Sequence, residues 1–320
     1  MRKIALITGI TGQDGSYLAK HLLEKGFSVF GTTRDIITAD TSNLEKLGIL
    51  NKIEILTTCI SDFRSLLLTL EKTNPDFIFH LAGQSSVGLS FSLPFEAIDS
   101  ILLSTLNLLE CVKFFNKKIK IFIPCSSDCF GSSTKENPSD ENSMHMPKSP
   151  YAIAKSSCYW LAMNYKNAYG MFISVGFLSN HESPLRGKHF VTSKIFDGIR
   201  KIKNKELKVL TFGNLDVFRD WGWAPSYIEA IYKMTIAENP DNYVIATGFT
   251  YSLREIINKA FILADLGDAS DYINENKNEL RPNEIKSSYL DPSKAKRNLN
   301  WNNSCTIETL IIKLLRQELY

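Results

Sequence analysis

Residues 8–15 read Thr-Gly-Ile-Thr-Gly-Gln-Asp-Gly, and this stretch decides the fold class. It follows residues 3–8 (KIALIT), a continuous apolar run that is typical of a strand buried on both faces of a parallel sheet. It precedes residues 16–24, where Leu18 and Leu22 share a helical face before a glycine ends the pattern. Three glycines spaced by three between a strand and a helix predict a turn that binds the pyrophosphate of a dinucleotide cofactor.

Each glycine of this turn has a predicted role. Gly9 permits the tight turn, Gly12 lets the backbone approach the pyrophosphate, and Gly15 allows the helix to pack closely on the sheet. The free N–H groups at the N-terminus of the helix then face the phosphates. A glycine turn that binds nothing is the alternative interpretation.

The end of the second predicted strand, at residues 27–32, indicates which dinucleotide binds. The sequence continues there with Thr33, Arg34 and Asp35. An acidic residue at this place usually holds the ribose hydroxyls of NAD, whereas an arginine can bind the 2′-phosphate of NADP. Arg34 therefore favours NADP, and the neighbouring Asp35 keeps NAD as the alternative.

Strands and helices alternate as far as about residue 180. Further strands are expected at 52–56, 76–81, 118–123 and 171–178, and helices at 63–72, 97–115 and 151–169. This alternation predicts an α/β fold, a Rossmann-like doubly wound parallel sheet.

The pattern changes after residue 180, where the segments become shorter. Helices are expected at 190–203, 225–237 and 306–317, and a strand at 207–211. We predict that residues 1–180 form the NADP-binding domain, to which some later segments return. Residues 181–320 are expected to form mainly a smaller α/β lobe that binds the substrate.

The composition narrows the class of protein. The 320 residues allow about two structural units. The 37 basic and 34 acidic residues leave a formal net charge of +3, which argues against a strongly basic nucleic-acid-binding protein. No apolar stretch reaches the roughly 20 residues of a membrane span, and the six cysteines form no C-x-x-C pair. We expect a cytoplasmic enzyme without a metal, a membrane segment or a nucleic-acid partner.

A tyrosine and a lysine open the helix predicted at 151–169. Tyr151 and Lys155 share one face of that helix. A lysine ammonium close to a phenol lowers the pKa of the tyrosine, which makes the phenol usable as a general acid or base. Residues 125–128 (CSSD) lie at the end of the preceding strand, where doubly wound sheets bind their ligands. Tyr-x-x-x-Lys alone is also common as a surface pattern, and the combination with the glycine turn is what points to catalysis.

These features resemble the extended short-chain dehydrogenase/reductase superfamily, and longer stretches resemble one family within it, GDP-mannose 4,6-dehydratase. The stretches are ITGITGQDGSYLAKHLLEKG, HLAGQSSVGLSF, SPYAIAKSSCYWLAMNY, NHESPLRGKHFVTSKI, GNLDVFRDWGWAPSY and RPNEIKSSYLDPSKAK, the last of which ends at residue 296. The stretches that contain NHESP and RDWG are far more specific than the superfamily motifs.

The resemblance implies a reaction that regenerates its own cofactor. In that family NADP⁺ takes a hydride from C4 of the hexose, the ketone acidifies C5, water leaves from C6, and the hydride returns to C6. Tyr151 would be the base at C4, Lys155 would tune it, and Ser126 would hydrogen-bond the C4 oxygen. Asp128 stands where the family has the glutamate that handles the C5 proton, and its side chain is one methylene shorter.

The resemblance also implies two sets of binding residues. Those expected at the cofactor are Gly9, Thr11, Gly12, Gln13, Asp14, Gly15, Arg34, Asp62, Leu81, Ala82, Gln84, Tyr151 and Lys155. Those expected at the substrate are Ser85, Ser126, Asn180, Arg186, Val191, Lys194, Arg219, Arg281 and Glu284. Arginines suit a diphosphate because a guanidinium fork can bind it through two hydrogen bonds.

The chain departs from the family pattern in several places. Residues 58–60 read Thr-Cys-Ile where Gly-Asp-Leu is usual, so an adenine-reading aspartate is missing or displaced to Asp62. Ser86 replaces a histidine, and the loop at 35–38, which in the family crosses a subunit interface, is short. These differences leave room for a modified manno-configured sugar, such as a heptose, on the nucleotide. We expect a homodimer or homotetramer.

Two other functions stay open at this point. A 4-keto-sugar reductase or epimerase of the same superfamily would also need Tyr151 and Lys155, but no base at C5. A non-catalytic NADP-binding sensor would need neither of them. Asp128 and the NHESP and RDWG stretches favour the dehydratase.

Overall fold

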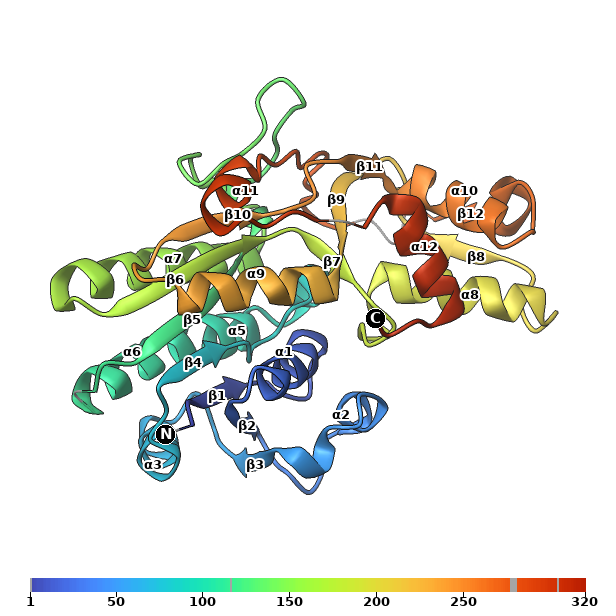
Figure 1. Cartoon of the computed structure of the whole chain (residues 1–320). Coiled ribbons are helices and arrows are strands. Elements are labelled where there is room, and N and C mark those ends of the chain that lie inside the picture. Colours follow the sequence, from blue (N-terminus) through green and yellow to red (C-terminus); the bar gives the residue numbers. More distant parts are fainter. Residues whose placement is uncertain (1, 116, 277–280, 304) are drawn as a thin grey trace.

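A parallel sheet of seven strands forms the centre of the computed structural model, which describes residues 2–115, 117–276, 281–303 and 305–320 (Figure 1). Its strands are β1 (Ile4–Thr8), β2 (Ser28–Thr33), β3 (Glu54–Thr57), β4 (Phe77–His80), β5 (Lys120–Ser126), β6 (Phe172–Leu178) and β10 (Asn242–Ile245). The strand order is β10-β6-β5-β4-β1-β2-β3, and every neighbouring pair is parallel. The predicted doubly wound α/β fold is confirmed.

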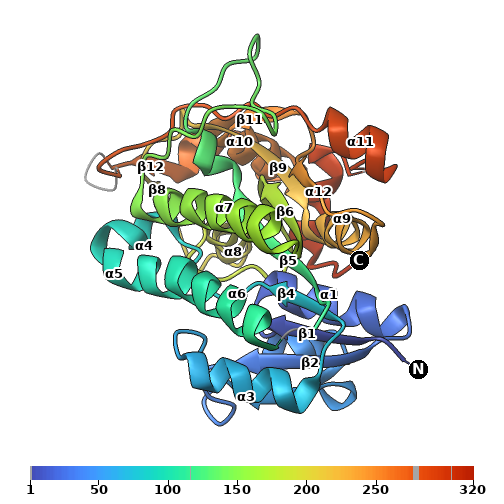
Figure 2. The same ribbon diagram turned by 90° about the vertical axis from the view of Figure 1, so that its left-hand side faces the viewer.

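Helices cover both faces of this sheet. One face carries α1 (Gln13–Glu24), α9 (Ala224–Ile236) and α11 (Ser293–Leu299). The opposite face carries α3 (Phe63–Thr73), α6 (Ser104–Phe115) and α7 (Pro150–Tyr169), which lie side by side in Figure 2. Two shorter segments, α2 (Ser42–Lys46) and η1 (Leu50–Lys52), connect β2 to β3.

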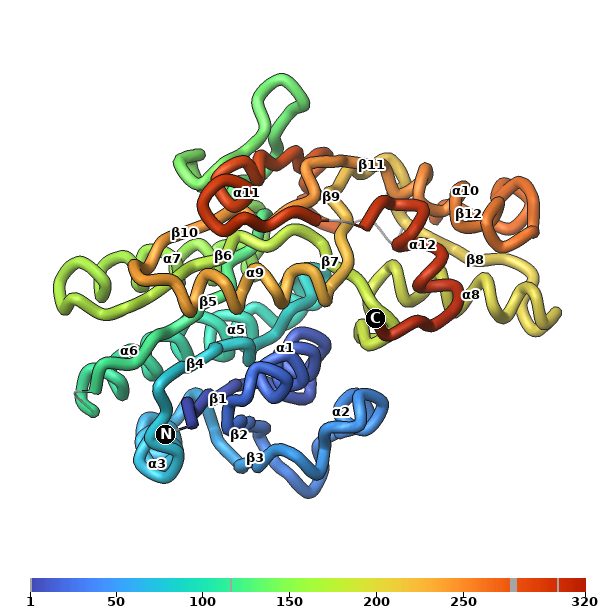
Figure 3. The backbone as a smooth tube through the Cα atoms, in the orientation of Figure 1, coloured from blue at the N-terminus to red at the C-terminus, as the bar shows by residue number. Residues whose placement is uncertain are grey.

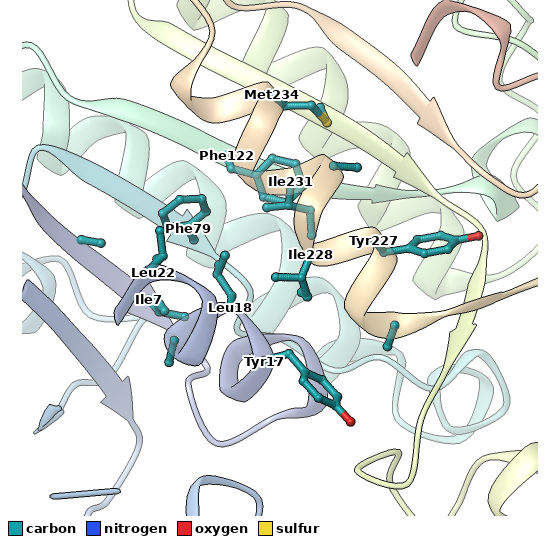
Figure 4. Close-up of a cluster of buried hydrophobic side chains, with 14 of the residues drawn as sticks. Ile7, Tyr17, Leu18, Leu22, Phe79, Phe122, Tyr227, Ile228, Ile231 and Met234 are labelled. Atoms are coloured by element: carbon teal, nitrogen blue, oxygen red, sulfur yellow. The ribbon is translucent and has the colours of Figure 1, made fainter. Parts of the chain in front are cut away.

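The core beneath α1 and α9 joins these helices to the sheet. Figure 4 shows Leu18 and Leu22 of α1 beside Phe79 of β4, with Phe122 of β5 close to Ile231 of α9. All five side chains are fully buried. Burying an apolar side chain of this size stabilises the fold by roughly 1.5–3 kcal/mol. The strands that carry the candidate site are thus held by a tightly packed core.

The helix predicted at 97–115 has a different first turn. The chain runs through α4 (Val87–Ser92) and α5 (Pro94–Ala97) into η2 (Ile98–Leu103), a π-helical turn, and only then into α6. Hydrophobic periodicity does not distinguish a π turn from an α turn over six residues. Such turns occur often at functional sites.

Elements after residue 180 form a second unit and also complete the first. The second unit has the sheet β11-β9-β7 and the parallel pair β12-β8. Its elements are β7 (Asn180–Glu182), α8 (Val191–Lys203), β8 (Leu210–Phe212), β9 (Phe218–Trp223), β11 (Thr250–Ser252), α10 (Leu253–Leu263), η4 (Ala269–Tyr272), β12 (Ile273–Glu275) and α12 (Ile307–Arg316). Figure 3 shows α8, α10 and α12 gathered beside β8 and β12 at one end of the large sheet.

The later part of the chain contributes α9 and β10 to the first sheet, where β10 pairs with β6. The three helices predicted after residue 180 are confirmed within one residue at each end, and the strand predicted at 207–211 lies at Leu210–Phe212. The division of tasks between residues 1–180 and 181–320 stays a prediction. Among the described residues, the helices include none that combines the length and apolar character of a membrane crossing.

Candidate active site

The glycine turn has the backbone geometry that its sequence predicts. Gly9 adopts a positive φ of 71°, and a Cβ atom on it would lie 2.9 Å from backbone atoms of Ala82. A Cβ atom on Gly15 would lie 2.3 Å from the carbonyl oxygen of Gly9, so only glycine lets α1 begin this close to the turn. A Cβ atom on Gly12 would come no closer than 3.4 Å to its nearest neighbour, which leaves that side of the turn accessible.

The side chains of Gln13 and Asp14 reach into the second unit. Gln13 Nε2 donates to the carbonyl oxygen of His181 at 3.1 Å, and Gln13 Oε1 accepts from Ser183 Oγ at 2.8 Å. Asp14 Oδ2 lies 2.9 Å from His181 Nε2. The first turn of α1 is thereby tied to β7 and the residue after it. The roles of Gln13 and Asp14 as cofactor contacts stay predictions. The structure shows in addition that their side chains connect the two units.

His181 is held as an imidazolium between two acceptors. Its Nδ1 donates to the carbonyl oxygen of Ser179 at 2.7 Å, its Nε2 faces Asp14, and its ring stacks on Tyr227 at 4.8 Å between centroids. Burial would lower the pKa of His181, but the charge of Asp14 and these hydrogen bonds raise it above its ordinary value. Burial would raise the pKa of Asp14, and the same ion pair instead lowers it to about 2.

Replacing Asp14 with asparagine should destabilise the fold in a pH-dependent way, by on the order of 2 kcal/mol at most. Folding lowers the pKa of Asp14 from 3.8, so its stabilisation is present above that value and is lost as the pH falls through about 2. Folding raises the pKa of His181 above 6.5, so its stabilisation is present below that value and is lost as the pH rises through the folded value. Urea titrations of wild type and variant should differ most near about pH 5.

An exposed carboxylate provides the control for this comparison. Asp271→Asn on η4 should change the unfolding free energy little at any pH, because Asp271 is exposed. A difference between wild type and Asp14→Asn that stays constant from acid to alkaline pH would show that the ion pair does not contribute as described.

A cavity of about 460 Å³ lies at the carboxyl ends of β4, β5 and β6, next to the second unit. This volume lies within the range of small-molecule sites. All the predicted catalytic and substrate-binding residues line it. The predicted residues in its lining are Asp14, Leu81, Ala82, Gln84, Ser85, Ser126, Asp128, Tyr151, Lys155, Asn180, Arg186, Val191, Lys194, Arg219, Arg281 and Glu284. The predicted residues outside it are Gly9, Thr11, Gly12, Gln13, Gly15, Arg34 and Asp62.

The start of α7 positions the tyrosine and the lysine. Ser149 caps the helix by accepting from the backbone N–H of Ala152 at 3.1 Å, and Pro150 occupies the first helical position. Tyr151 and Lys155 then face the cavity one turn apart. The ammonium of Lys155 donates to the carbonyl oxygen of Pro124 at 2.9 Å and lies 6.0 Å from the centre of the Tyr151 ring.

The surroundings of Tyr151 disfavour its phenolate in this arrangement, and the predicted tuning by Lys155 stays a prediction. Burial, followed by the charge of the Asp128 carboxylate, raises the pKa of Tyr151 well above its ordinary value, and a hydrogen bond with Ser126 only partly lowers it. The reason is geometric, because the Lys155 ammonium is bonded to the backbone of β5 rather than to the phenol. The phenol is therefore a proton donor in this structure, and it needs a further positive charge nearby to act as a base.

Asp128 lies close to Arg219 and Arg281 of the second unit, which line a small second cavity with it. It belongs to η3 (Ser127–Phe130), and its backbone N–H donates to Ser126 Oγ at 3.2 Å. Among the described residues, no hydrogen bond or ion pair engages its carboxylate. Asp128 also lines a second cavity of about 10 Å³ together with Lys148, and a space of that size holds about one water molecule. The carboxylate is thus available to a ligand in the main cavity.

Two arginines of the cavity lining share one carboxylate. Arg219 Nη2 and Arg281 Nη1 each lie 3.1 Å from Glu284 Oε1. Burial lowers the pKa of the Arg219 guanidinium, and the carboxylates of Asp128 and Glu284 oppose that shift. The two guanidinium groups supply the kind of donors that bind a diphosphate, and Asp128 and Glu284 balance their charge.

A third arginine, Arg186, also lines the cavity. Arg186 Nε lies 3.3 Å from Glu182 Oε2, and its guanidinium lies 3.7 Å from the centre of the Phe190 ring. Val191 begins α8, and Lys194 follows one turn later with its ammonium 5.1 Å from the centre of the Phe212 ring. Val191 and Lys194 therefore lie at an end of the cavity that also carries the aromatic rings of Phe190 and Phe212.

The residues predicted to read the cofactor ribose and adenine lie at the ends of β2 and β3. Arg34 is exposed and has no hydrogen bond or ion pair with any described residue. The carboxylate of Asp35 accepts from Ile37 N and Thr38 Oγ1, both at 2.9 Å, and so closes its own loop. Asp62 caps α3 by accepting from the backbone N–H of Ser65 at 2.6 Å. Arg34 is therefore the group at the end of β2 that is open to a ligand.

Sequence reasoning missed several polar residues at the cavity. His181 and Glu182 line it, and Glu182 is almost fully buried. Asp220, directly behind the cavity, accepts from Ser179 Oγ at 2.8 Å and from the backbone N–H of Gly248 at 2.7 Å. Their place inside the NHESP and RDWG stretches was a signal, but only the fold shows which partners they meet. The described residues contain no cluster of three side chains suited to a metal ion.

Comparison with known proteins agrees with this geometry. The family model for GDP-mannose 4,6 dehydratase matches residues 6–314. The chain is 38% identical over 328 residues to GDP-mannose 4,6 dehydratase 1 of Arabidopsis thaliana, covering 99% of this chain and 90% of that protein. It is 35% identical over 343 residues to GDP-mannose 4,6 dehydratase of Homo sapiens, covering 99% of this chain and 91% of that protein.

Solved structures show the same fold at lower sequence identity. A dTDP-glucose 4,6-dehydratase from Bacillus anthracis in complex with NAD has a TM-score of 0.85 at 19% identity, over 98% of this chain and 96% of that one. RMD from Pseudomonas aeruginosa, complexed with NADPH, has a TM-score of 0.80 at 21% identity, over 99% of this chain and 97% of that one. The match to the family model and the full-length similarity to its members decide the assignment: the chain belongs to the GDP-mannose 4,6-dehydratase family.

Proposed function

We propose that this chain is a GDP-mannose 4,6-dehydratase, a hydro-lyase that forms a 4-keto-6-deoxy sugar on the nucleotide. The observation that carries the proposal is one cavity lined by Ser126, Asp128 and Tyr151 and also by Arg219 and Arg281. The relatives named above are dehydratases of GDP-mannose, and this arrangement has the groups that such a reaction requires.

The residues present fit a nicotinamide cofactor. The accessible side of Gly12, the N-terminus of α1 and the exposed Arg34 would hold its phosphates, and Ala82, next to Gly9, together with Lys155 would adjoin its ring end. A bound cofactor would supply the hydride transfer from C4 and back to C6, and its oxidised ring would carry a positive charge. That charge favours the phenolate of Tyr151 and complements Lys155.

Tyr151 and Ser126 would work at C4 of the sugar. The Tyr151 phenolate would take the proton of the 4-hydroxyl as that carbon becomes a ketone. Ser126, at the end of β5, donates a hydrogen bond to the same oxygen and so fixes its position. In this step the sugar would lose a hydride from C4 and a proton from its 4-hydroxyl, and Tyr151 would take that proton.

Asp128 would work at C5 and C6. The C4 ketone acidifies the C5 proton, which the free carboxylate accepts. The C6–O bond then breaks, the hydroxyl leaves as water with a proton, and a C5–C6 double bond forms. The C5–C6 double bond would then accept at C6 the hydride that a bound cofactor supplies, and a solvent-derived proton would add at C5. Asp128 needs to come close to C5, because misplacement by about 1 Å can cost roughly 10²-fold in rate.

We propose NADP as the cofactor, with NAD as the alternative. Replacing Arg34 with alanine should weaken NADP⁺ binding roughly 10- to 100-fold more than NAD⁺ binding, because only NADP⁺ carries the 2′-phosphate. Isothermal titration calorimetry with each dinucleotide measures both affinities. Arg297→Ala, an exposed arginine on α11, is the matched control. Equal losses of affinity for both dinucleotides would show that Arg34 does not contact the 2′-phosphate.

An assay with NADP⁺ and a panel of nucleotide sugars separates the candidate functions. Loss of water from GDP-mannose, or from a GDP-linked heptose, without net formation of NADPH identifies a dehydratase. Consumption of NADPH with a 4-keto sugar identifies a reductase, and an isomer of unchanged mass identifies an epimerase. Tight NADP⁺ binding without turnover identifies a sensor.

A homodimer or homotetramer in the cytoplasm is proposed as the working form. The outer face of α7 supports self-association, because Ile153 is 48% and Trp160 is 60% exposed on it. Sedimentation equilibrium at several protein concentrations measures the assembly state.

A further inference from the structure

A buried histidine lies behind the candidate cofactor site and takes no part in the proposed reaction. His80 is the last residue of β4 and only 2% exposed. The loop that follows it, residues 81–86, lines the cavity throughout. A buried histidine at such a place must have partners for both of its ring nitrogens.

Those partners come from two other elements and define a direction for every hydrogen bond. His80 Nδ1 lies 3.0 Å from Thr8 Oγ1 at the end of β1, and His80 Nε2 lies 3.3 Å from Ser104 Oγ. Ser104 donates its single hydroxyl proton to the carbonyl oxygen of Ser100 at 2.6 Å. Its oxygen must therefore accept from Nε2–H, and Nδ1 accepts from the hydroxyl of Thr8.

The chain of hydrogen bonds ends on the backbone of the cavity loop. Thr8 Oγ1 accepts from the backbone N–H of Ala82 at 3.2 Å. The bonds thus run in one sense from Ala82 through Thr8 and His80 to Ser104 and Ser100. Hydrogen bonds aligned in this way strengthen one another in a buried site.

The π-helical turn η2 contacts the same loop a second time. Ser100 Oγ accepts from the backbone N–H of Gln84 at 3.1 Å. Gly83 has a φ of 135°, and a Cβ atom on it would lie 2.9 Å from the carbonyl oxygen of Ser100. Ser104, the partner of His80, bonds to that same carbonyl. The π-helical turn therefore connects His80 to the loop 81–86.

We propose that His80 is a positioning residue that fixes loop 81–86 for the dinucleotide by joining Thr8 to Ser104 and the π-helical turn. The proposal rests on the cofactor site proposed above. The neutral form of His80 suits this chain, and burial, followed by the charge of Lys155, lowers the pKa of His80 to about 3. The histidine therefore keeps the same two hydrogen bonds across the neutral pH range.

Three variants test the role by calorimetry with NADP⁺ and, separately, with GDP. His80→Leu keeps the volume and removes both hydrogen bonds, and Ser104→Ala removes the acceptor on the far side of the ring. Each should weaken NADP⁺ binding roughly five- to tenfold and leave GDP binding unchanged. His80→Gln offers an amide oxygen and an amide N–H in similar places, so it should recover part of the NADP⁺ affinity.

Ser174→Ala is the matched control for loss of a buried hydroxyl in the same sheet. Ser174 lies fully buried on β6 and donates to the carbonyl oxygen of Met234 at 3.2 Å, away from the loop. It should lower stability without changing NADP⁺ affinity. His80→Leu and Ser104→Ala with wild-type NADP⁺ affinity, or an equal loss in Ser174→Ala, would overturn the positioning role. Wild-type protein that binds no dinucleotide would instead overturn the cofactor site itself.

Discussion

Replacing Tyr151 with phenylalanine should reduce turnover of GDP-mannose by roughly 10²- to 10⁴-fold, while GDP binding stays unchanged. The substitution removes only the phenol oxygen that exchanges a proton at C4. The groups expected to bind the diphosphate, Arg219 and Arg281, are other side chains of the cavity that the substitution leaves in place. A coupled turnover assay and calorimetry with GDP measure the two effects separately.

A second tyrosine of the same helix provides the control. Tyr165 is buried on α7 and donates to the Glu110 carboxylate, far along the helix from the cavity. Tyr165→Phe should keep most of the turnover. A Tyr151→Phe enzyme with near-normal turnover would remove Tyr151 from the chemistry, and an equal loss in both variants would point to a general effect on α7.

Replacing Asp128 with asparagine should stop the reaction after the first hydride transfer. The amide keeps the shape of the side chain but cannot accept the C5 proton. Oxidation at C4 depends on Tyr151, Lys155 and the cofactor, so it should continue. In a single turnover the variant should accumulate NADPH absorbance and a 4-keto sugar, and water loss should slow by roughly 10²-fold or more.

Two further variants serve as controls for this result. Asp128→Glu carries the longer side chain that is usual in the family, and it should retain dehydration. Asp140→Asn changes a carboxylate that bonds within its own turn, to Ser143 Oγ at 2.9 Å, and it should behave as wild type. Dehydration by Asp128→Asn at the wild-type rate would require another base, and Glu284 would be the next carboxylate on the cavity wall.

Much of the fold could be predicted from local sequence patterns. The strands of the large sheet before residue 180 are apolar runs separated by helices, and each is found within a few residues of its predicted place. Strand β10 was not predicted because it lies after the regular alternation of strands and helices has ended, and its partner β6 lies more than sixty residues earlier in the chain. Short strands such as β7 and β9 exist because other segments pair with them, and this information is not local.

The candidate site divides in the same way. Tyr151, Lys155 and the glycine turn lie in motifs whose spacing carries their chemistry. The pairing of Asp14 with His181 joins residues 167 positions apart. The ammonium of Lys155, which was expected at the phenol of Tyr151, bonds to the carbonyl oxygen of Pro124. Sequence spacing predicts which residues face a site, whereas the state of each proton depends on neighbours brought together by the fold.

Turnover of GDP-mannose in heavy water tests the central claim most directly. The protein is incubated with GDP-mannose and a catalytic amount of NADP⁺, NADPH absorbance is followed, and the sugar is analysed by mass spectrometry. We predict a product that has lost one water and gained one deuterium at C5, with no net NADPH. Net change in NADPH with the sugar oxygen retained, or no conversion although both ligands bind, would contradict the assignment of this chain as a dehydratase.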